Sequence, residues 1–259
     1  MKKYQKIIIQ VVFIGLCLCF WEWYAHYKDT MAFPTIGAIL NTLFEDMFVS
    51  DIRPILEYLG KSLLLIAEGL GIGMTLAFIF SGLSVASEVF NTIYNLIVSI
   101  CDLLPAVALM PILMITLGAN DTTIIILVIH SVVWPMSRNV IDGFKSVPKM
   151  HIESGRNIGL GKVGLIFGIY IPSSFASIIS GIRVGWARAW RGLISAEMIF
   201  GAASAAGLGT YINNARTIWM SFSSVYAALI LIILVGVIVE YGIFANIEKH
   251  TVRKWGMIR

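Results

Sequence analysis

Six long apolar segments constrain the fold of this chain more than any other feature of its sequence. They cover residues 7–23, 62–83, 89–117, 122–136, 175–200 and 225–247. A hydrocarbon core about 30 Å thick takes roughly 20 apolar residues per helical crossing, so 259 residues leave space for about six crossings and their loops. Only 13% of the residues are charged, against about 25% in soluble domains, which excludes water as the main solvent. We therefore predict an all-α integral membrane protein with six transmembrane helices.

The first, third and fifth apolar segments each carry a complication. The first follows a basic start at residues 2–6, as in a secretory signal, but bulky residues rather than a small-residue cleavage site come after it, so we favour an uncleaved helix. The third contains Pro105 and Pro111, which predict a kink or a local break. The fifth is marginal by hydropathy because it contains four charged residues, Arg183, Arg188, Arg191 and Glu197.

Lysine and arginine are distributed unequally between the loops. With the amino terminus inside, the cytoplasmic segments hold twelve of the basic residues, while the opposite side holds Lys28, Arg53 and Arg216, with Lys61 at a helix boundary. Because positive charge is retained on the cytoplasmic side, we predict that both termini face the cytoplasm. The net charge of +4 reflects this sidedness and gives no reason to propose nucleic-acid binding, so membrane lipid is the expected surrounding.

Two local features stand out in the loops on the outer side. Residues 36–47 place their apolar side chains on one helical face, so we expect a helix that lies flat on the outer interface. The glycine- and alanine-rich stretch 201–209 should turn tightly. We divide the chain into an N-terminal transmembrane and interfacial region, a transmembrane domain and a cytoplasmic tail, with the bounds 1–57, 58–247 and 248–259.

The longest cytoplasmic stretch, residues 138–172, carries the most specific pattern. It contains Glu153-Ser154-Gly155, then Gly159, then Ile169-Tyr170-Ile171-Pro172. This pattern resembles the signature of the inner-membrane permeases of binding-protein-dependent ABC importers, which reads Glu-Ala-Ala, three residues, Gly, nine residues, Ile, one residue, Leu-Pro. Every interval matches, and the chain departs from the signature at Ser154, Gly155 and Ile171.

The resemblance extends from about Phe33 to the carboxyl end. Residues 104–111, Gly181-Ile182-Arg183 and Gly207-Leu208-Gly209 are similar to patterns of the nitrate, sulfonate and taurine permease subfamily. The resemblance implies the type I ABC importer transmembrane fold, in a homodimer that lies in the plasma (inner) membrane of a bacterium or archaeon. It also implies ABC ATPase subunits, which would bind ATP and Mg, and an extracytoplasmic solute-binding protein as partners, with no cofactor bound by this chain.

In such permeases a short cytoplasmic helix docks into the ATPase subunit. The resemblance assigns this contact to Glu153, Ser154, Gly155, Gly159, Ile169 and Pro172. Pro148 suits a helix start, Gly159 and Gly161 suit its end, and Glu153 lies near its positive amino-terminal end. Gly155 costs about 1 kcal/mol of helix propensity relative to alanine, but it would permit a closer approach of the partner. An ordinary solvated connector is the alternative.

No segment predicts ATP or hydrolytic chemistry. The stretch 159–163 lacks the hydroxyl residue and the first glycine of a phosphate loop, and neither His-Glu-x-x-His nor Gly-x-Ser-x-Gly occurs. Cys17, Cys19 and Cys101 have no paired spacing and no nearby histidine, so they suggest neither a zinc site nor a disulfide. We expect a transport subunit without catalytic or metal-binding residues. Carrier-mediated transport without ATP and an intramembrane enzyme are the two alternatives.

Six ionisable residues within the apolar segments are the candidates for a solute pathway or for pairing between helices. Each costs at least about 2.5–3.5 kcal/mol when charged at the bilayer centre, so each must face protein or water. Arg188 and Arg191 share a helical face because they are three residues apart. We assign Asp102, Pro105, Arg188, Arg191 and Glu197 to the pathway. Structural pairing is the alternative, and we favour it for Glu68, His130 and Glu197.

Asp102 bears on the charge of the solute. Subfamily members that import anions commonly carry a basic residue three positions before the first proline of the third helix, where this chain has Asp102. Arg191 could be the compensating charge, in a relocated pair with Asp102. A sulfonate, nitrate, taurine, or a neutral or zwitterionic solute such as a vitamin precursor therefore all stay open.

Overall fold

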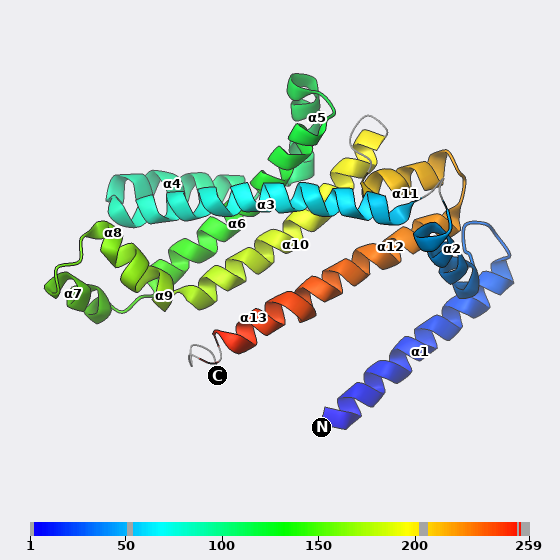
Figure 1. The fold of residues 1–259 in the computed structure, drawn as a ribbon, viewed down its shortest axis with the longest axis horizontal. Coiled ribbons are helices and arrows are strands. Elements are labelled where there is room, and N and C mark those ends of the chain that lie inside the picture. The colour runs from blue at the N-terminus through cyan, green and yellow to red at the C-terminus, as the bar shows by residue number, and fades with distance from the viewer. Residues whose placement is uncertain (1–2, 51–53, 202–206, 253, 255–259) are drawn as a thin grey trace.

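The described part of the chain is entirely helical. We analysed a computed structural model that describes residues 3–50, 54–201, 207–252 and 254, and no strand occurs among them. Arg53 and most of the expected turn at 201–209 lie outside the described residues. The helices form an elongated bundle, with α1 set apart along one side (Figure 1). The predicted all-α fold is confirmed.

Among the described residues, four helical runs are long and apolar enough to cross a membrane, and two bent pairs bring the total to six if each pair is one span. The four are Tyr4–Lys28, Ile55–Ala86, Asp121–Lys145 and Phe222–His250. The bent pairs are Glu88–Cys101 with Ala106–Leu117, at 94°, and Lys162–Ser173 with Phe175–Phe200, at 76°. Each of the six predicted apolar segments thus falls in one of these six units.

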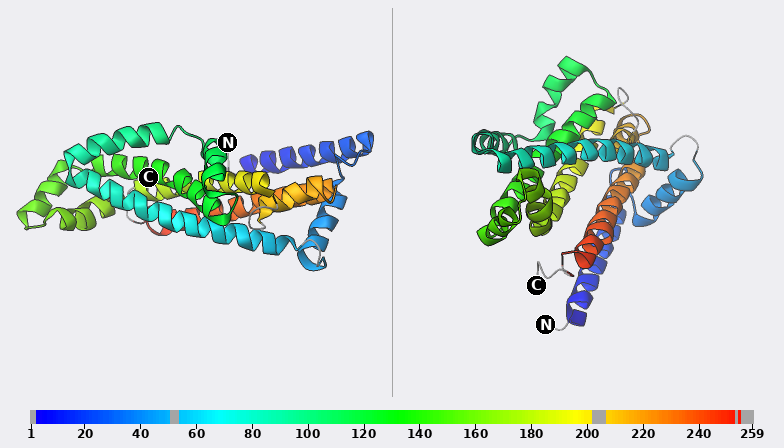
Figure 2. Two further views of the ribbon diagram at one scale, coloured as in Figure 1. Left: turned by 90° about the horizontal axis from the view of Figure 1, so that it is seen from above. Right: turned by 60° about the vertical axis from the view of Figure 1, so that its left-hand side comes forward.

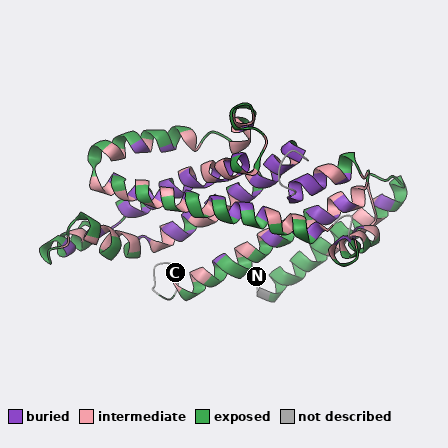
Figure 3. Ribbon diagram, turned by 45° about the horizontal axis from the view of Figure 1, so that its top comes forward, coloured by how far each residue is buried: buried purple, intermediate pink, exposed green. Residues whose placement is uncertain are grey.

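The centre of the bundle consists of α3 (Ile55–Ala86), α6 (Asp121–Lys145) and α10 (Phe175–Phe200). Glycines let these helices approach closely, as small residues do where helices pack in membranes. A Cβ on Gly73 of α3, for example, would lie 2.9 Å from the Cβ of Val132 in α6. Buried residues concentrate on α6, α10 and the neighbouring α11, whereas α1 is exposed along most of its length (Figure 3).

The predicted third crossing is broken into two helices. After Ser87 the chain reverses, and α4 (Glu88–Cys101) packs back along α3, as two views show (Figures 1 and 2). The break falls at residues 102–105, and α5 (Ala106–Leu117) leaves at 94° to α4. The expected local break is confirmed, and Pro105 is its last residue. Pro111 lies inside α5.

The predicted fourth crossing, 122–136, is too short. Helix α6 continues to Lys145, so Arg138 belongs to a central helix and not to the loop that follows it. Four short elements come next: α7 (Lys149–Asn157), α8 (Lys162–Leu165), the π-helix η1 (Ile166–Tyr170) and α9 (Ile171–Ser173). Hydropathy identified only the part of α6 that is apolar enough for lipid, since the last turns carry Arg138, Asp142 and Lys145.

The two ends of the chain run beside the central bundle. Helix α1 (Lys3–Lys28) is followed by α2 (Ile36–Phe48), whose first turn is capped by the Thr35 hydroxyl, which accepts from the Ala38 N–H at 3.2 Å. After α11 (Leu208–Thr217), one continuous run comprises α12 (Phe222–Val237), η3 (Ile238–Phe244) and α13 (Ala245–His250). The start of α1 and the end of α13 both point away from α2 and α11, which lie at the end of the molecule opposite α7 (Figure 1).

Arg183 ties the end of the chain to α10. Its guanidinium contacts Glu248 at 3.0 Å and Glu240 at 3.4 Å, and it lies 5.5 Å from the ring centroid of Phe244. One of the four charges that interrupt the fifth apolar segment is therefore paired with the last helices.

Candidate functional site

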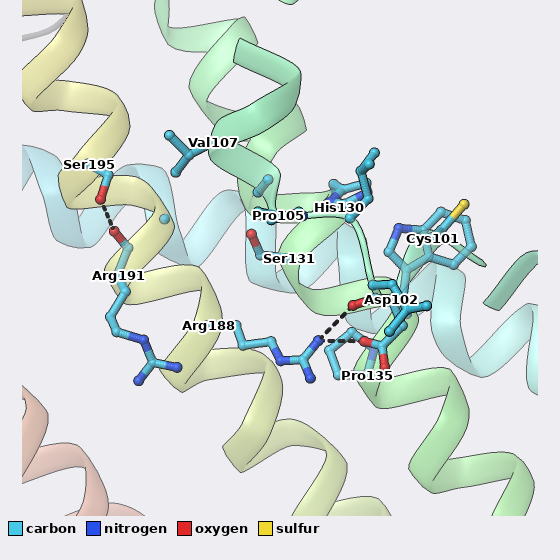
Figure 4. Close-up of a pocket in the computed structure, with 15 residues that line it drawn as sticks. Cys101, Asp102, Pro105, Val107, His130, Ser131, Pro135, Arg188, Arg191 and Ser195 are labelled. Atoms are coloured by element: carbon cyan, nitrogen blue, oxygen red, sulfur yellow. Dashed lines mark hydrogen bonds and ion pairs between the residues drawn. The ribbon is translucent and has the colours of Figure 1, made fainter. Parts of the chain in front are cut away.

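A charged cavity lies where the chain breaks between α4 and α5. It has a volume of about 340 Å³, within the range of small-molecule sites, and α6 and α10 complete its walls. Its lining includes Asp102, Pro105, His130, Arg188, Arg191 and Ser195 (Figure 4). Four of the five predicted pathway residues are thus brought together, and Glu197 is not among them.

Asp102 is held between two arginines. One carboxylate oxygen, Oδ1, bonds to Nη1 of Arg188, and the other, Oδ2, lies 3.2 Å from Nε of Arg138. Only 10% of the Asp102 side chain is exposed. The expected pair of Asp102 with Arg191 is wrong. Arg188 takes that place from the same face of α10, and Arg138 was missed because the sequence placed it outside the membrane. We call Asp102, Arg138 and Arg188 the Asp102 cluster.

Arg191 also lines the cavity, one turn beyond Arg188. Its guanidinium makes no ion pair with any described carboxylate, and Figure 4 shows it pointing away from Asp102 while that of Arg188 points toward it. The backbone carbonyl of Arg191 accepts a hydrogen bond from the Ser195 hydroxyl at 2.9 Å. A charged group inside a membrane-spanning helix is costly without a partner, so Arg191 is the residue of this site that most needs one.

His130 and Trp134 add two nitrogen atoms beside the cavity. Both residues line it, with their rings 5.9 Å apart, and His130 Nδ1 and Trp134 Nε1 are buried without a hydrogen-bond partner among the described residues. The sequence favours a structural role for His130. The structure places His130 in the lining of the cavity.

Glu197 belongs to a separate, fully buried cluster. Its carboxylate accepts from the Ser62 hydroxyl, at 2.8 and 2.9 Å to the two oxygens, and from the Gly209 N–H at 2.9 Å. The Ser62 oxygen in turn accepts from the Leu208 N–H at 2.8 Å. The carboxylate therefore lies at the positive amino-terminal end of α11 and connects α3, α10 and α11. We call Ser62, Glu197, Leu208 and Gly209 the Glu197 cluster. This position does not support the assignment of Glu197 to the solute pathway.

Asp46 is a buried acid that the sequence did not single out. Only 1% of the residue is exposed, and its Oδ2 accepts from the hydroxyls of Tyr211 and of Ser224, the latter at 3.2 Å. It joins α2 to α11 and α12. The residue lies beside the apolar face of α2, and nothing in the spacing distinguishes it from the exposed acids nearby. Glu68, by contrast, lies on an exposed face of α3.

The predicted short helix after α6 is present as α7. Pro148 precedes its first residue and Gly159 follows it with φ of +84°, a left-handed conformation that favours glycine. Gly155 is buried, and a Cβ there would overlap Leu165 and Ile169 of the following segment. The space left by Gly155 is thus filled by this chain, and the expectation that it serves the approach of a partner is wrong.

Most of the remaining signature residues face outward. Glu153, Ser154, Gly159 and Pro172 are exposed, and Ile169 is partly buried beneath Gly155. The signature therefore combines two physical roles that its spacing alone does not separate. Gly155 and Ile169 fix α7 on the helices behind it, and Glu153 and Ser154 present an exposed face.

Comparison with known proteins agrees with this arrangement. Residues 69–253, which is more than half of the chain, match the family described as binding-protein-dependent transport system inner membrane component. The chain belongs to this family of transport permeases. The match runs from the middle of α3 through the cavity, α7 and the Glu197 cluster to the last helices, so the permease is a multi-pass membrane protein with the type I importer fold.

Individual relatives of the permease are distant but cover most of its length. A protein of Methanocaldococcus jannaschii named as an ABC transporter permease is 26% identical over 96% of this chain and 92% of its own length. The taurine transport system permease protein TauC of Escherichia coli is 24% identical over 83% of this chain and 72% of its own. The nitrate import permease protein NrtB of a Synechocystis species is 26% identical over 80% and 73%.

Proposed function

We propose that this permease couples solute import to ATP hydrolysis by a separate ATPase subunit, which contacts the exposed face of α7. The observation that carries the proposal is the construction of α7 itself. The helix is only nine residues long, has Pro148 and Gly159 at its ends, and is anchored through Gly155 to the segment that leads into α10. A short rigid helix attached in this way can transmit movement of a partner to a membrane-spanning helix.

The cavity supports a role in the pathway. It lies between α5, α6 and α10 of one chain and is not fully enclosed, and a second copy placed against it would complete the enclosure. We infer a homodimer that receives solute from an extracytoplasmic binding protein, with ATP and Mg bound by the ATPase subunits. Both termini and α7 would then face the cytoplasm of a bacterial or archaeal cell, in agreement with the basic residues on that side. The relatives named for taurine and nitrate make small solutes of that kind the first candidates.

The coupling role is tested by removing the features of α7 without disturbing the rest. The permease carries an affinity tag and is purified from the membranes of its own organism, and vanadate-sensitive ATP hydrolysis in the eluate is measured. We expect Glu153→Arg and Gly159→Val to insert normally but to lose most of the co-purified activity, since the first reverses a charge on the exposed face and the second cannot adopt φ of +84° without strain.

Gly161→Ala is the matched control. Gly161 has an ordinary φ of −72°, and a Cβ there would meet nothing within 4 Å, so this variant should keep the activity. Unchanged co-purification of the ATPase with both Glu153→Arg and Gly159→Val would refute the assignment. Solute uptake that survives deletion of the ATPase would indicate a carrier instead.

A further inference from the structure

The charges around the cavity are not balanced. Its lining contains one carboxylate, Asp102, and two guanidinium groups, Arg188 and Arg191, and Asp102 also pairs with Arg138 from outside the lining. Three arginines therefore face one aspartate. These four side chains together carry a net charge of +2.

The single carboxylate is not available to a ligand. Both of its oxygens are engaged by arginines, and 10% of the side chain is exposed. A cationic group in the cavity would have to displace one of these arginines and would then lie beside the others. An anionic group meets no such obstacle, because no described carboxylate pairs with the guanidinium of Arg191, whose donors can bind a carboxylate, sulfonate or phosphate oxygen.

We propose that this cavity is a subsite for an anionic group of the transported solute, and that Arg191 determines its preference for negative charge. That the bound anion is the transported solute rests on the proposed function. The charge preference of the cavity itself is a property of this chain alone. The Asp102 cluster holds the one carboxylate between two arginines and keeps a net charge of +1, and Arg191 adds a cation that the solute would pair with.

Thiol chemistry measures this preference directly. Ser195 lines the cavity one turn from Arg191, and it is replaced by cysteine in a full-length chain whose Cys17, Cys19 and Cys101 are serine. The purified protein in lipid nanodiscs reacts with either an anionic or a cationic methanethiosulfonate, the sulfonatoethyl and the trimethylammonium-ethyl reagents. The ratio of the two rates is divided by the same ratio for free mercaptoethanol.

We expect this normalised ratio to exceed about 3 and to fall roughly 3- to 10-fold in Arg191→Gln, as removal of one nearby unit charge predicts at a dielectric between those of water and of the protein interior. Arg191→Lys should keep the ratio. Arg216→Gln removes the same charge from an exposed position of α11 outside the cavity lining and should also keep it. Val107→Cys, on the α5 wall, is a second reporter if Ser195→Cys does not purify as a monodisperse peak.

A normalised ratio at or below 1, or a ratio that Arg191→Gln leaves within two-fold of its starting value, would overturn the proposal. The second result is expected if an acid of a second copy already neutralises Arg191. Labelling needs neither an ATPase nor a known solute. Failure of the charge preference and failure of the coupling role are therefore distinguished, because the latter changes the co-purified ATPase and not this ratio.

Discussion

The two halves of α10 place charged residues in opposite circumstances. Toward the α11 end, Glu197 is fully buried, and its carboxylate accepts hydrogen bonds from Ser62 and Gly209. In the middle of the same helix, Arg188 and Arg191 are exposed at a cavity, and Arg191 lacks a described acidic partner. The sequence offered no reason to separate them, since all three interrupt one apolar segment.

The difference indicates which intramembrane charges hold the protein together and which are available for function. A buried polar group is tolerated when all of its hydrogen bonds are made, and the Glu197 cluster meets that condition for the contacts described. The groups around the cavity do not, because Arg191, His130 Nδ1 and Trp134 Nε1 lack partners among the described residues. We therefore expect stability to depend on the first region and solute selection on the second.

We expect the largest loss of stability from Glu197→Ala, which removes the carboxylate of the Glu197 cluster. The change leaves the Gly209 N–H and the Ser62 hydroxyl without their acceptor in a buried site, at a cost of about 2–5 kcal/mol. In a chain of this size, that loss lowers the apparent Tm by roughly 5–15 °C. Fluorescence-detected size-exclusion chromatography after heating measures it in detergent extracts.

Glu197→Gln is the matched variant, because it retains one acceptor oxygen at the same place. Its loss of stability should be about half as large. If Glu197→Ala instead melts at the temperature of the native chain while solute uptake fails, Glu197 is a pathway residue. The Glu197 cluster would then not differ in role from the residues around the cavity.

A smaller change in Tm should show which arginine pairs with Asp102. Asp102→Arg places three arginines together and should cost about 1 kcal/mol, a modest figure because Arg138 and Arg188 are each more than a third exposed. Adding Arg188→Asp restores an ion pair and should recover more than half of the lost Tm. Adding Arg191→Asp should recover little, since Arg191 points away from Asp102 (Figure 4).

Equal recovery by the two double variants would show that Arg191 can reach position 102 and would restore the pair predicted from the sequence. The same heated-extract assay reports all four chains. The Arg191→Asp change alone serves as the control for any effect of reversing that charge.

The sequence predicted the helical units well because a bilayer leaves few alternatives. Segments of suitable length and hydropathy must become helices, and the break before Pro105 and the ends of α7 follow from proline and glycine chemistry. The permease signature was found by its spacing. What hydropathy could not supply was the extent of α6 beyond Met136, because its last turns are polar while remaining helical.

The contacts between helices were beyond the reach of sequence reasoning. The Asp102 cluster joins residues 36 and 86 positions apart, and the Asp46 carboxylate meets Tyr211 across 165 positions. Such pairings depend on how the helices rotate and pack, and helical periodicity shows only which residues share a face. That is why Arg188 and Arg191 were placed correctly on one face, while the choice between them as the partner of Asp102 was wrong.

Accessibility to water along α10 tests the central claim most directly. Single cysteines at Gly192, Leu193, Ile194, Ser195 and Ala196, in a chain without other cysteines, are exposed in nanodiscs to a membrane-impermeant thiosulfonate. We predict labelling at positions 192 and 195, which line the cavity, and none at the buried positions 193, 194 and 196. After denaturation, all five cysteines should be labelled equally. Protection of all five positions, or uniform labelling of all five in the native protein, would contradict a water-filled pathway on this face of α10.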